Sequence, residues 1–380
     1  MARAAEEFGL CRNLKGYIEA VTIFATIMES SAQLMPSQLR IYLDHAATTP
    51  VVAPARAAMI EGLEYWANPS SPHNEGRAAR AALEDARKRI AAAFDWDGEV
   101  IFTSGASEAI AIGLRGVDAV ASAVEHDAVL AFVPSERIPV DAEGLVDPDA
   151  MKASKRYAIQ SVNNETGVIQ PLEAIANTVR RYGGTWLADC SQSAGKMPLP
   201  DADLITISAH KLGGPPGIGA LLVRNLGLLQ PSGGQEQGYR RGTENLPAVL
   251  GFAAALEAGF GWMAEAERLR FLLDKAITDA GSEVVALHAS RLPTIASYRM
   301  PGVSASTQLI GFDMGQVAVS AGSACSSGTI KTSHVLEAMG WDSKAASEVL
   351  RVSFGPETSE AEIAYFIETW RTIAARAKAA

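Results

Sequence analysis

Short runs of apolar residues alternate along the chain with longer segments in which apolar residues recur every three or four positions. The longer segments, such as 75–93 and 172–181, are rich in alanine and have the period of helices. The short runs have the length of buried strands and occupy residues 99–103, 157–162, 185–188, 204–208 and 218–223. Strands separated by helices predict an α/β fold in which a mostly parallel sheet is covered by helices on both faces.

A second group of strand-like runs lies near the end of the chain, after a helical stretch that begins past Ala264. These runs occupy residues 295–299, 316–320 and 350–353. We therefore predict a large domain of residues 53–263 and a smaller α+β domain of residues 40–52 and 264–380. Residues 1–39 are only weakly periodic, so we interpret them as a flexible N-terminal extension or as an upstream start that the cell does not use.

Composition narrows the class of protein. The chain has 380 residues, of which 48% are hydrophobic and 20% charged, and this fits a soluble protein with a large core. A formal net charge of -10 argues against nucleic-acid binding, which depends on clustered basic residues. The longest early apolar run, residues 21–28, is too short to cross a membrane and has no secretory signal around it.

The number and spacing of the cysteines indicate the redox environment in which the protein works. Cys11, Cys190 and Cys325 are odd in number and widely spaced, which fits neither a disulfide framework nor a Cys-x-x-Cys metal site. A reducing environment suits such a chain best. We therefore expect a cytoplasmic protein without a metal centre, and with neither nucleic acid nor membrane as a partner.

Polar residues follow the predicted strands, where parallel sheets bind their ligands. Lys211 comes after the run 204–208 and precedes a Gly/Pro-rich turn. A lone lysine is usually a solvated charge, but one that bonds covalently to a carbonyl must be partly desolvated, so that its amine loses a proton near neutral pH. Ser208 and His210, its neighbours, could donate hydrogen bonds to a phosphate.

Asp189 closes another predicted strand, where a carboxylate is costly unless it has a partner. It is either the N-cap of a following helix or the partner of a pyridinium nitrogen, which would make that ring an electron sink. In the second case Gln192 would face a hydroxyl of the ring.

Four further segments carry candidate chemistry. Ala106 and Ser107 open a helix after a Gly/Ser turn, where backbone N–H groups can cradle a phosphate. His126 and Asn164 follow strands, although a structural histidine and an Asn/Gly turn are the simpler interpretations. Cys325 stands in the sequence SAGSACSSG, whose small polar residues would let its thiol be exposed and move, whereas most cysteines are buried.

Taken together, these segments resemble the cysteine desulfurases, a branch of the fold-type-I enzymes that use pyridoxal 5'-phosphate. The resemblance runs from residue 41 to about residue 370, and its motifs stand in the family's order. They are YLDHAATTP (42–50), NPSSPH (68–73), TSGASEA (103–109), EHDAV (125–129), VNNETGVIQP (162–171), ADCSQSAGK (188–196), SAHKLGGPPGIGAL (208–221), RRGTEN (240–245), SAGSACSSG (320–328) and LRVSFG (350–355).

The resemblance implies a seven-stranded sheet in the large domain and a role for each matching residue. Lys211 would hold the cofactor covalently, Asp189 would pair with its ring nitrogen, and His126 would stack on the ring and move protons. Gln192 and Asn164 would contact the cofactor. Its phosphate would be bound by Ala106, Ser107, Ser208 and His210, together with Thr243 from the other subunit of a homodimer. The substrate carboxylate would be bound by Arg351, Asn164 and Asn68.

The implied reaction converts L-cysteine to L-alanine and leaves the sulfur on Cys325 as a persulfide. Only a thiolate is nucleophilic enough to accept it. The persulfide would then pass to a sulfur acceptor or an iron–sulfur scaffold protein, and tRNA thiolation and thiamine synthesis are other destinations. The stretch 109–112 (AIAI) is apolar where the family is polar, and Ser107 replaces a threonine but keeps the hydroxyl.

Three other functions remain open from the sequence. A related aminotransferase or lyase would keep Lys211, Asp189 and His126 but would not need Cys325. A selenocysteine lyase or a cysteine-sulfinate enzyme would share the carboxylate clamp, so relative rates on the three substrates would separate them. A non-enzymatic sulfur-relay or scaffold subunit would not need the intact set of residues.

Overall fold

The computed structural model describes residues 40–134, 137–324, 330–331 and 333–379. The predicted N-terminal extension, residues 1–39, and the predicted sulfur acceptor, Cys325, lie outside the described residues. The chain divides into two units, residues 1–41 and 42–380, and strand β1 (Ile41–Tyr42) stands at their boundary. The fold described below is that of the second unit.

A seven-stranded sheet organises the first part of this unit. Each strand is parallel to its neighbours except β8, which is antiparallel to both β2 and β7. The mostly parallel sheet implied by the sequence is therefore confirmed. The strand order is β2 (Glu99–Thr103), β8 (Gly219–Val223), β7 (Leu204–Ser208), β6 (Thr185–Asp189), β5 (Arg156–Ala158), β3 (Ala119–Ser122) and β4 (Arg137–Ile138).

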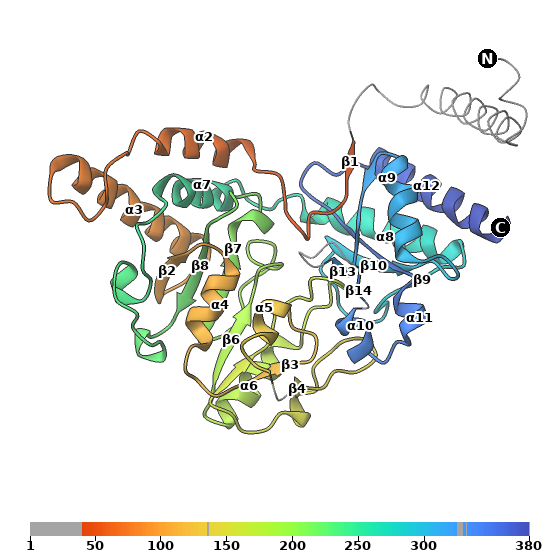
Figure 1. Ribbon diagram of the computed structural model, residues 1–380, viewed down its shortest axis with the longest axis horizontal. Coiled ribbons are helices and arrows are strands. Elements are labelled where there is room, and N and C mark those ends of the chain that lie inside the picture. Colours follow the sequence, from red (N-terminus) through yellow and green to blue (C-terminus); the bar gives the residue numbers. More distant parts are fainter. Residues whose placement is uncertain (1–39, 135–136, 325–329, 332, 380) are drawn as a thin grey trace, which may run out of the picture. The chain divides into compact units, whose positions relative to one another are not determined.

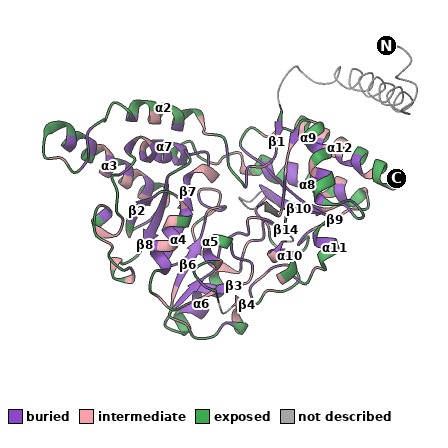
Figure 2. Cartoon of the chain, in the orientation of Figure 1, coloured by how far each residue is buried: buried purple, intermediate pink, exposed green. Residues whose placement is uncertain are grey.

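Both faces of this sheet are buried, because successive side chains of a strand point to opposite sides. In β2, Val100 and Phe102 belong to one apolar cluster and Ile101 to another. The first cluster is covered by α3 (Asn74–Ala93), α6 (Leu172–Arg181) and α7 (Leu246–Glu257), and the second by α4 (Ala106–Leu114) and α5 (Asp127–Leu130). Helix α2 (Ala53–Gly62) packs on α7 (Figure 1). Figure 2 shows the strands buried and the outer surfaces of the helices exposed.

A four-stranded antiparallel sheet lies in the C-terminal part. Its order is β12 (Ser320–Ala321), β15 (Val349–Ser353), β10 (Ile295–Arg299) and β9 (Glu283–Val284). Helices α8 (Met263–Asp279), α9 (Ala305–Met314), α10 (His334–Ala338), α11 (Ser343–Ala346) and α12 (Glu360–Ala379) accompany it, with short strands β11 (Val317–Ala318), β13 (Ser323–Ala324) and β14 (Ile330–Lys331). The division into domains at residues 263 and 264 stays a prediction.

The strand ends bring the predicted polar residues together. Asp189 is the last residue of β6 and pairs in register with Thr206 of β7, two positions before Ser208 ends that strand. The predicted strand 157–162 is shorter as β5, yet its extended backbone continues, since the N–H of Ile159 and of Ser161 donate to Leu187 and Asp189. No helix in the described part of the chain is long and apolar enough to span a bilayer.

Candidate active site

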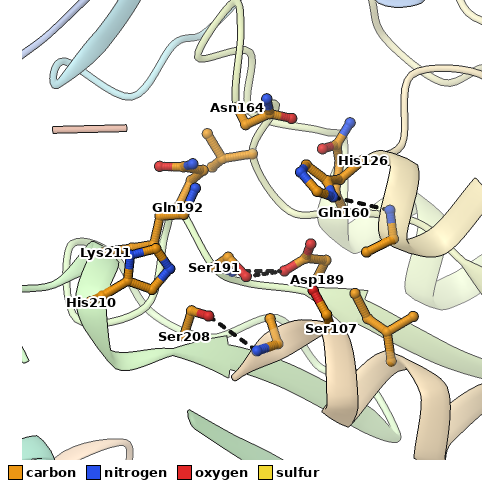
Figure 3. A pocket seen from close by; sticks show the side chains of 14 residues that line it. Ser107, His126, Gln160, Asn164, Asp189, Ser191, Gln192, Ser208, His210 and Lys211 are labelled. Carbon is orange, nitrogen blue, oxygen red and sulfur yellow. Dashed lines mark hydrogen bonds between the residues drawn. The ribbon is translucent and has the colours of Figure 1, made fainter. Parts of the chain in front are cut away.

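A cavity of about 200 Å³ opens at the carboxyl edge of the seven-stranded sheet (Figure 3). Most of the residues predicted to form a site border it. In the view of Figure 3, Lys211 and His210 stand on one side and His126 on the other, with Asp189 between them. The lining residues are Ala106, Ser107, Ile110, His126, Ala128, Gln160, Val162, Asn164, Asp189, Ser191, Gln192, Ser208, His210 and Lys211.

Lys211 has the environment expected of a nucleophilic amine. It stands in a short 3-10 turn, residues Ala209–Lys211, directly after β7. Its Nζ donates a 2.6 Å hydrogen bond to the carbonyl oxygen of Ala46. Burial, together with the positive charge of Arg351, lowers the pKa of the Lys211 amine to about 8, although Asp189 and Asp44 oppose the shift. The amine is therefore partly neutral near physiological pH.

Asp189 and Gln192 each present an oxygen to the cavity. Three donors, Ser191 N at 2.9 Å, Ser191 Oγ at 2.6 Å and Thr206 Oγ1 at 3.2 Å, all bind Oδ1 of Asp189. This arrangement fixes the carboxylate, and among the described residues Oδ2 has no hydrogen-bond donor, so it can meet a ligand. Residues 191–196 form turns, so Asp189 does not cap a helix. Gln192 donates from Nε2 to the carbonyl of Ala46, and its buried Oε1 has no partner among the described residues.

The start of helix α4 forms another wall of the cavity. Gly105, its N-cap, has a φ of 151°, which side-chain-bearing residues rarely adopt. A Cβ on Gly219 of β8 would lie only 2.7 Å from the Cα of Gly105, so both glycines are needed for this close approach. Ser208 Oγ accepts from the N–H of Ala106 at 3.0 Å, which leaves the next N–H groups of the helix as donors for an anion.

Two imidazoles flank this anion site and the cavity. His210 Nδ1 lies 3.2 Å from Oγ1 of Thr48, and burial beside Lys211 lowers the pKa of His210 to about 4. His126 caps α5, and its Nδ1 accepts from the N–H of Ala128 at 3.1 Å. A nitrogen that accepts a hydrogen bond carries no proton, so the proton of neutral His126 is on Nε2.

A second cavity, of about 340 Å³, adjoins the first and shares His126, Asn164 and Lys211 with it. Arg351 of β15 is buried in its wall and is held by Asp44 Oδ1 at 2.8 Å and by the carbonyl of Asn164 at 3.0 Å. Its buried Nε has no partner among the described residues, and a carboxylate could supply one. The other residues around this cavity are Ala46, Ala47, Asp127, Glu165, Ser320, Gly322 and His334.

The structure does not bring every predicted site residue to these cavities. Asn68 is exposed, and its Oδ1 accepts from the N–H of Ser70. This local hydrogen bond stabilises a turn in the loop that contains Asn68. Thr243 is also exposed and borders neither cavity. Their roles stay predictions, as does that of Cys325, which lies outside the described residues.

Several residues of the site were missed from the sequence. Ser191 orients Asp189 through two hydrogen bonds, and Asp44 pairs with Arg351. Glu165 accepts a 2.6 Å hydrogen bond from Ser333 Oγ, and a Cβ on Gly322 would lie 2.4 Å from its Oε2. Ser191 and Asp44 lie inside two of the recognised family motifs, and these motifs were the signal that could have identified them as site residues. The residues that they contact are revealed only by the fold.

Comparison with known proteins agrees with this geometry. The family model for aminotransferase class V matches residues 41–366. The cysteine desulfurase IscS of Dictyoglomus turgidum is 35% identical over 370 residues, which cover 88% of this chain and 94% of the relative. The structure of a NifS-like protein from Rickettsia africae superposes with a TM-score of 0.81 at 30% identity and covers 88% of this chain and 99% of its own. A structure of SspA in complex with cysteine has a TM-score of 0.73 at 29% identity, and the match covers 84% of this chain and 100% of the SspA chain.

The fold and the cavity define a class-V aminotransferase fold with a lysine at the carboxyl edge of its sheet, and enzymes of this family depend on pyridoxal 5'-phosphate. The unmatched Oε1 of Gln192, the free oxygen of Asp189 and the amine of Lys211 fit the polar groups of that cofactor. The chain belongs to the cysteine desulfurase branch of the class-V aminotransferase family.

Replacing Asp189 by asparagine tests the importance of its charge. The amide keeps an oxygen for Ser191 and Thr206 but loses the negative charge that we expect to pair with the ring nitrogen of the cofactor. We expect turnover to fall by at least about 10²-fold, as when one preorganised electrostatic partner is removed from an active site. The measurement is turnover with saturating cofactor, with Asp201→Asn in an exposed ion pair as the control. Equal turnover in the two variants would exclude this role.

Proposed function

We propose that the chain converts L-cysteine to L-alanine and transfers the sulfur to Cys325 as a persulfide, with pyridoxal 5'-phosphate held at Lys211. The observation that carries this proposal is a pair of cavities that both border Lys211, one lined by Asp189 and Gln192 and the other with Arg351 in its wall. A substrate amine at Lys211 and a carboxylate at Arg351 would place the side chain of an amino acid in the second cavity.

The residues of the first cavity have complementary roles toward the cofactor. Asp189 would pair through Oδ2 with the ring nitrogen, and Gln192 would meet the ring hydroxyl. Ser107, Ser208 and His210, with the first N–H groups of α4 beginning at Ala106, would bind the phosphate. When bound, pyridoxal 5'-phosphate withdraws electrons from the α-carbon of the substrate and weakens the bonds around it.

The chain's own residues then bind the substrate and move its protons. Arg351 would hold the carboxylate through its guanidinium, with Asn164 beside it. Lys211 Nζ, once it is free, would take the α-proton, and its lowered pKa makes it a usable base near neutral pH. His126, whose Nε2 carries a proton, would stand over the ring and donate to the substrate. Cys325 would attack the substrate sulfur.

Three wider features belong to the same proposal. We infer a homodimer in which Thr243 reaches the phosphate of the other subunit, because this residue is exposed and borders neither cavity of its own chain. Asn68 would approach the substrate only after a change of its loop. The persulfide would pass to a sulfur-acceptor protein or an iron–sulfur scaffold protein, and the IscS name of a relative is in keeping with the latter. We expect this transfer to take place in the cytoplasm.

The test is a comparison of substrates. Purified protein reconstituted with pyridoxal 5'-phosphate and supplied with L-cysteine and a reducing thiol is expected to release alanine and sulfide in equal amounts. L-selenocysteine and cysteine sulfinate are run in parallel. A rate on either of these that far exceeds the rate on L-cysteine would assign the protein to a different activity, and no alanine from any of them would reject an enzymatic role.

A further inference from the structure

The second cavity is lined by two histidines that both carry their proton on Nε2 when neutral, but that use different ring nitrogens to bind the backbone. His126 accepts through Nδ1 from the N–H of Ala128, so its proton is on Nε2. His334, the first residue of α10, has its Nε2 2.9 Å from the carbonyl oxygen of Glu125. Because a carbonyl can only accept, the proton of neutral His334 is on Nε2 and its Nδ1 carries the lone pair. One cavity therefore offers a neutral acid and a neutral base.

The ring of His334 lies on the proposed substrate side of the site. Both His334 and Asp127 line the second cavity, together with Lys211 and Arg351. Nδ1 of His334 lies 4.0 Å from Oδ1 of Asp127, so this carboxylate faces the nitrogen. About a third of the His334 side chain is exposed, so a substrate can reach the ring.

The overall reaction requires one base and one acid at this place. The sulfur-accepting thiol loses its proton as it bonds to the substrate sulfur. The bond between that sulfur and the β-carbon breaks, its electron pair stays on the carbon side, and the carbon then gains a proton. The two sulfur atoms are oxidised as the carbon is reduced, so no outside oxidant is needed. One proton must leave a thiol, and one must arrive at carbon.

We propose that His334 Nδ1 is the base that takes the proton of the sulfur-accepting thiol. This inference rests on the proposed function. It does not depend on the position of Cys325, because any thiol that attacks the substrate sulfur must enter the cavity that His334 lines. The ring that takes this proton faces Asp127, and His126 or Lys211 supplies the proton at carbon.

Several charged or titratable groups surround His334 and bear on any pH dependence. Glu125, whose carbonyl oxygen accepts from the ring, is fully buried, and burial raises the pKa of its carboxyl group. Burial also raises the pKa of Glu165. The groups facing the same cavity are Asp44, His126, Asp127, Glu165, Lys211 and Arg351.

The test uses His334→Gln, whose side-chain amide can still donate to the carbonyl of Glu125 but provides no base. We expect single-turnover formation of alanine from L-cysteine at pH 7 to slow by about 10²-fold, the effect of removing a general base. The deficit is expected to shrink as the pH rises above about 8.5, where a thiol ionises without help. The absorption of the bound cofactor should stay unchanged, and exposed His288→Gln should match the wild type.

Two results would overturn the role of His334. One is a wild-type rate at pH 7 in the variant, and the other is the same deficit at every pH, which indicates a structural defect. If His334→Gln does not fold, His334→Asn, which also lacks the base, is put through the same pH series. Wild-type protein that makes no alanine from L-cysteine would instead defeat the proposed function, which separates the two failures.

Discussion

Lys211→Ala protein is expected to acquire no visible absorption from pyridoxal 5'-phosphate and to lose turnover of L-cysteine by about 10⁴-fold or more. The substitution would remove both the proposed covalent anchor and the proposed base for the α-proton, and a general base alone contributes about 10²- to 10⁴-fold. Lys211 is the one lysine among the described residues that line the two cavities, so no second amine is present there to replace it. Absorbance after reconstitution and alanine release measure the two losses separately.

The environment of Lys211 also predicts how attachment of the cofactor depends on pH. Since burial and Arg351 lower the pKa of the amine to about 8, the amine is protonated and unreactive below this pH and becomes nucleophilic as the pH rises through it. The rate of cofactor attachment should increase over the same range. Lys275→Ala, in an exposed ion pair on α8, is the matched control. Attachment to Lys211→Ala at the control's rate would contradict the assignment.

Cys325→Ala protein is expected to bind the cofactor normally and to form no persulfide. Of the three cysteines, Cys190 is fully buried, and burial raises the pKa of its thiol to about 12, so it cannot supply a thiolate at neutral pH. Cys11 lies in the segment without family motifs. Sulfur transfer should therefore be lost completely, whereas the absorption spectrum of the bound cofactor should not change.

The control for this substitution is Cys11→Ala, which should keep the wild-type rate. Persulfide is measured as the gain of one sulfur atom on the cysteine-containing peptides after L-cysteine is added. Sulfur transfer at the normal rate by Cys325→Ala would show that another group accepts the sulfur.

The fold and the cofactor cavity could be predicted because their signals are local. Strand ends follow apolar runs, and parallel strands bring these ends to one edge, so Asp189 and Lys211 could be placed together from the sequence. The apolar stretch that replaces a polar one in the family also has a physical explanation. Ala109, Ile110 and Ile112 of α4 are buried, because this helix packs its full length on the sheet.

Other parts of the site depend on contacts that no local pattern reveals. The carbonyl of Ala46 accepts from both Lys211 and Gln192, and a backbone carbonyl has no residue signature. His334 lies 209 positions from Glu125, so its tautomer follows only from the tertiary fold. Asn68 and Thr243 were assigned by motif, and a single chain places neither of them at its own cavities.

The most direct test asks which lysine binds the cofactor covalently, because both Lys211 and Lys196 have lowered pKa values. Burial and Lys211 lower the pKa of Lys196 to about 7, but Lys196 borders a different cavity, near Trp96 and Pro198. Protein incubated with pyridoxal 5'-phosphate is reduced with borohydride, and the modified peptide is identified by mass spectrometry. The pyridoxyl group is expected on Lys211. Its attachment to Lys196, or to no lysine, would contradict the central claim that the cavity at Lys211 holds the cofactor.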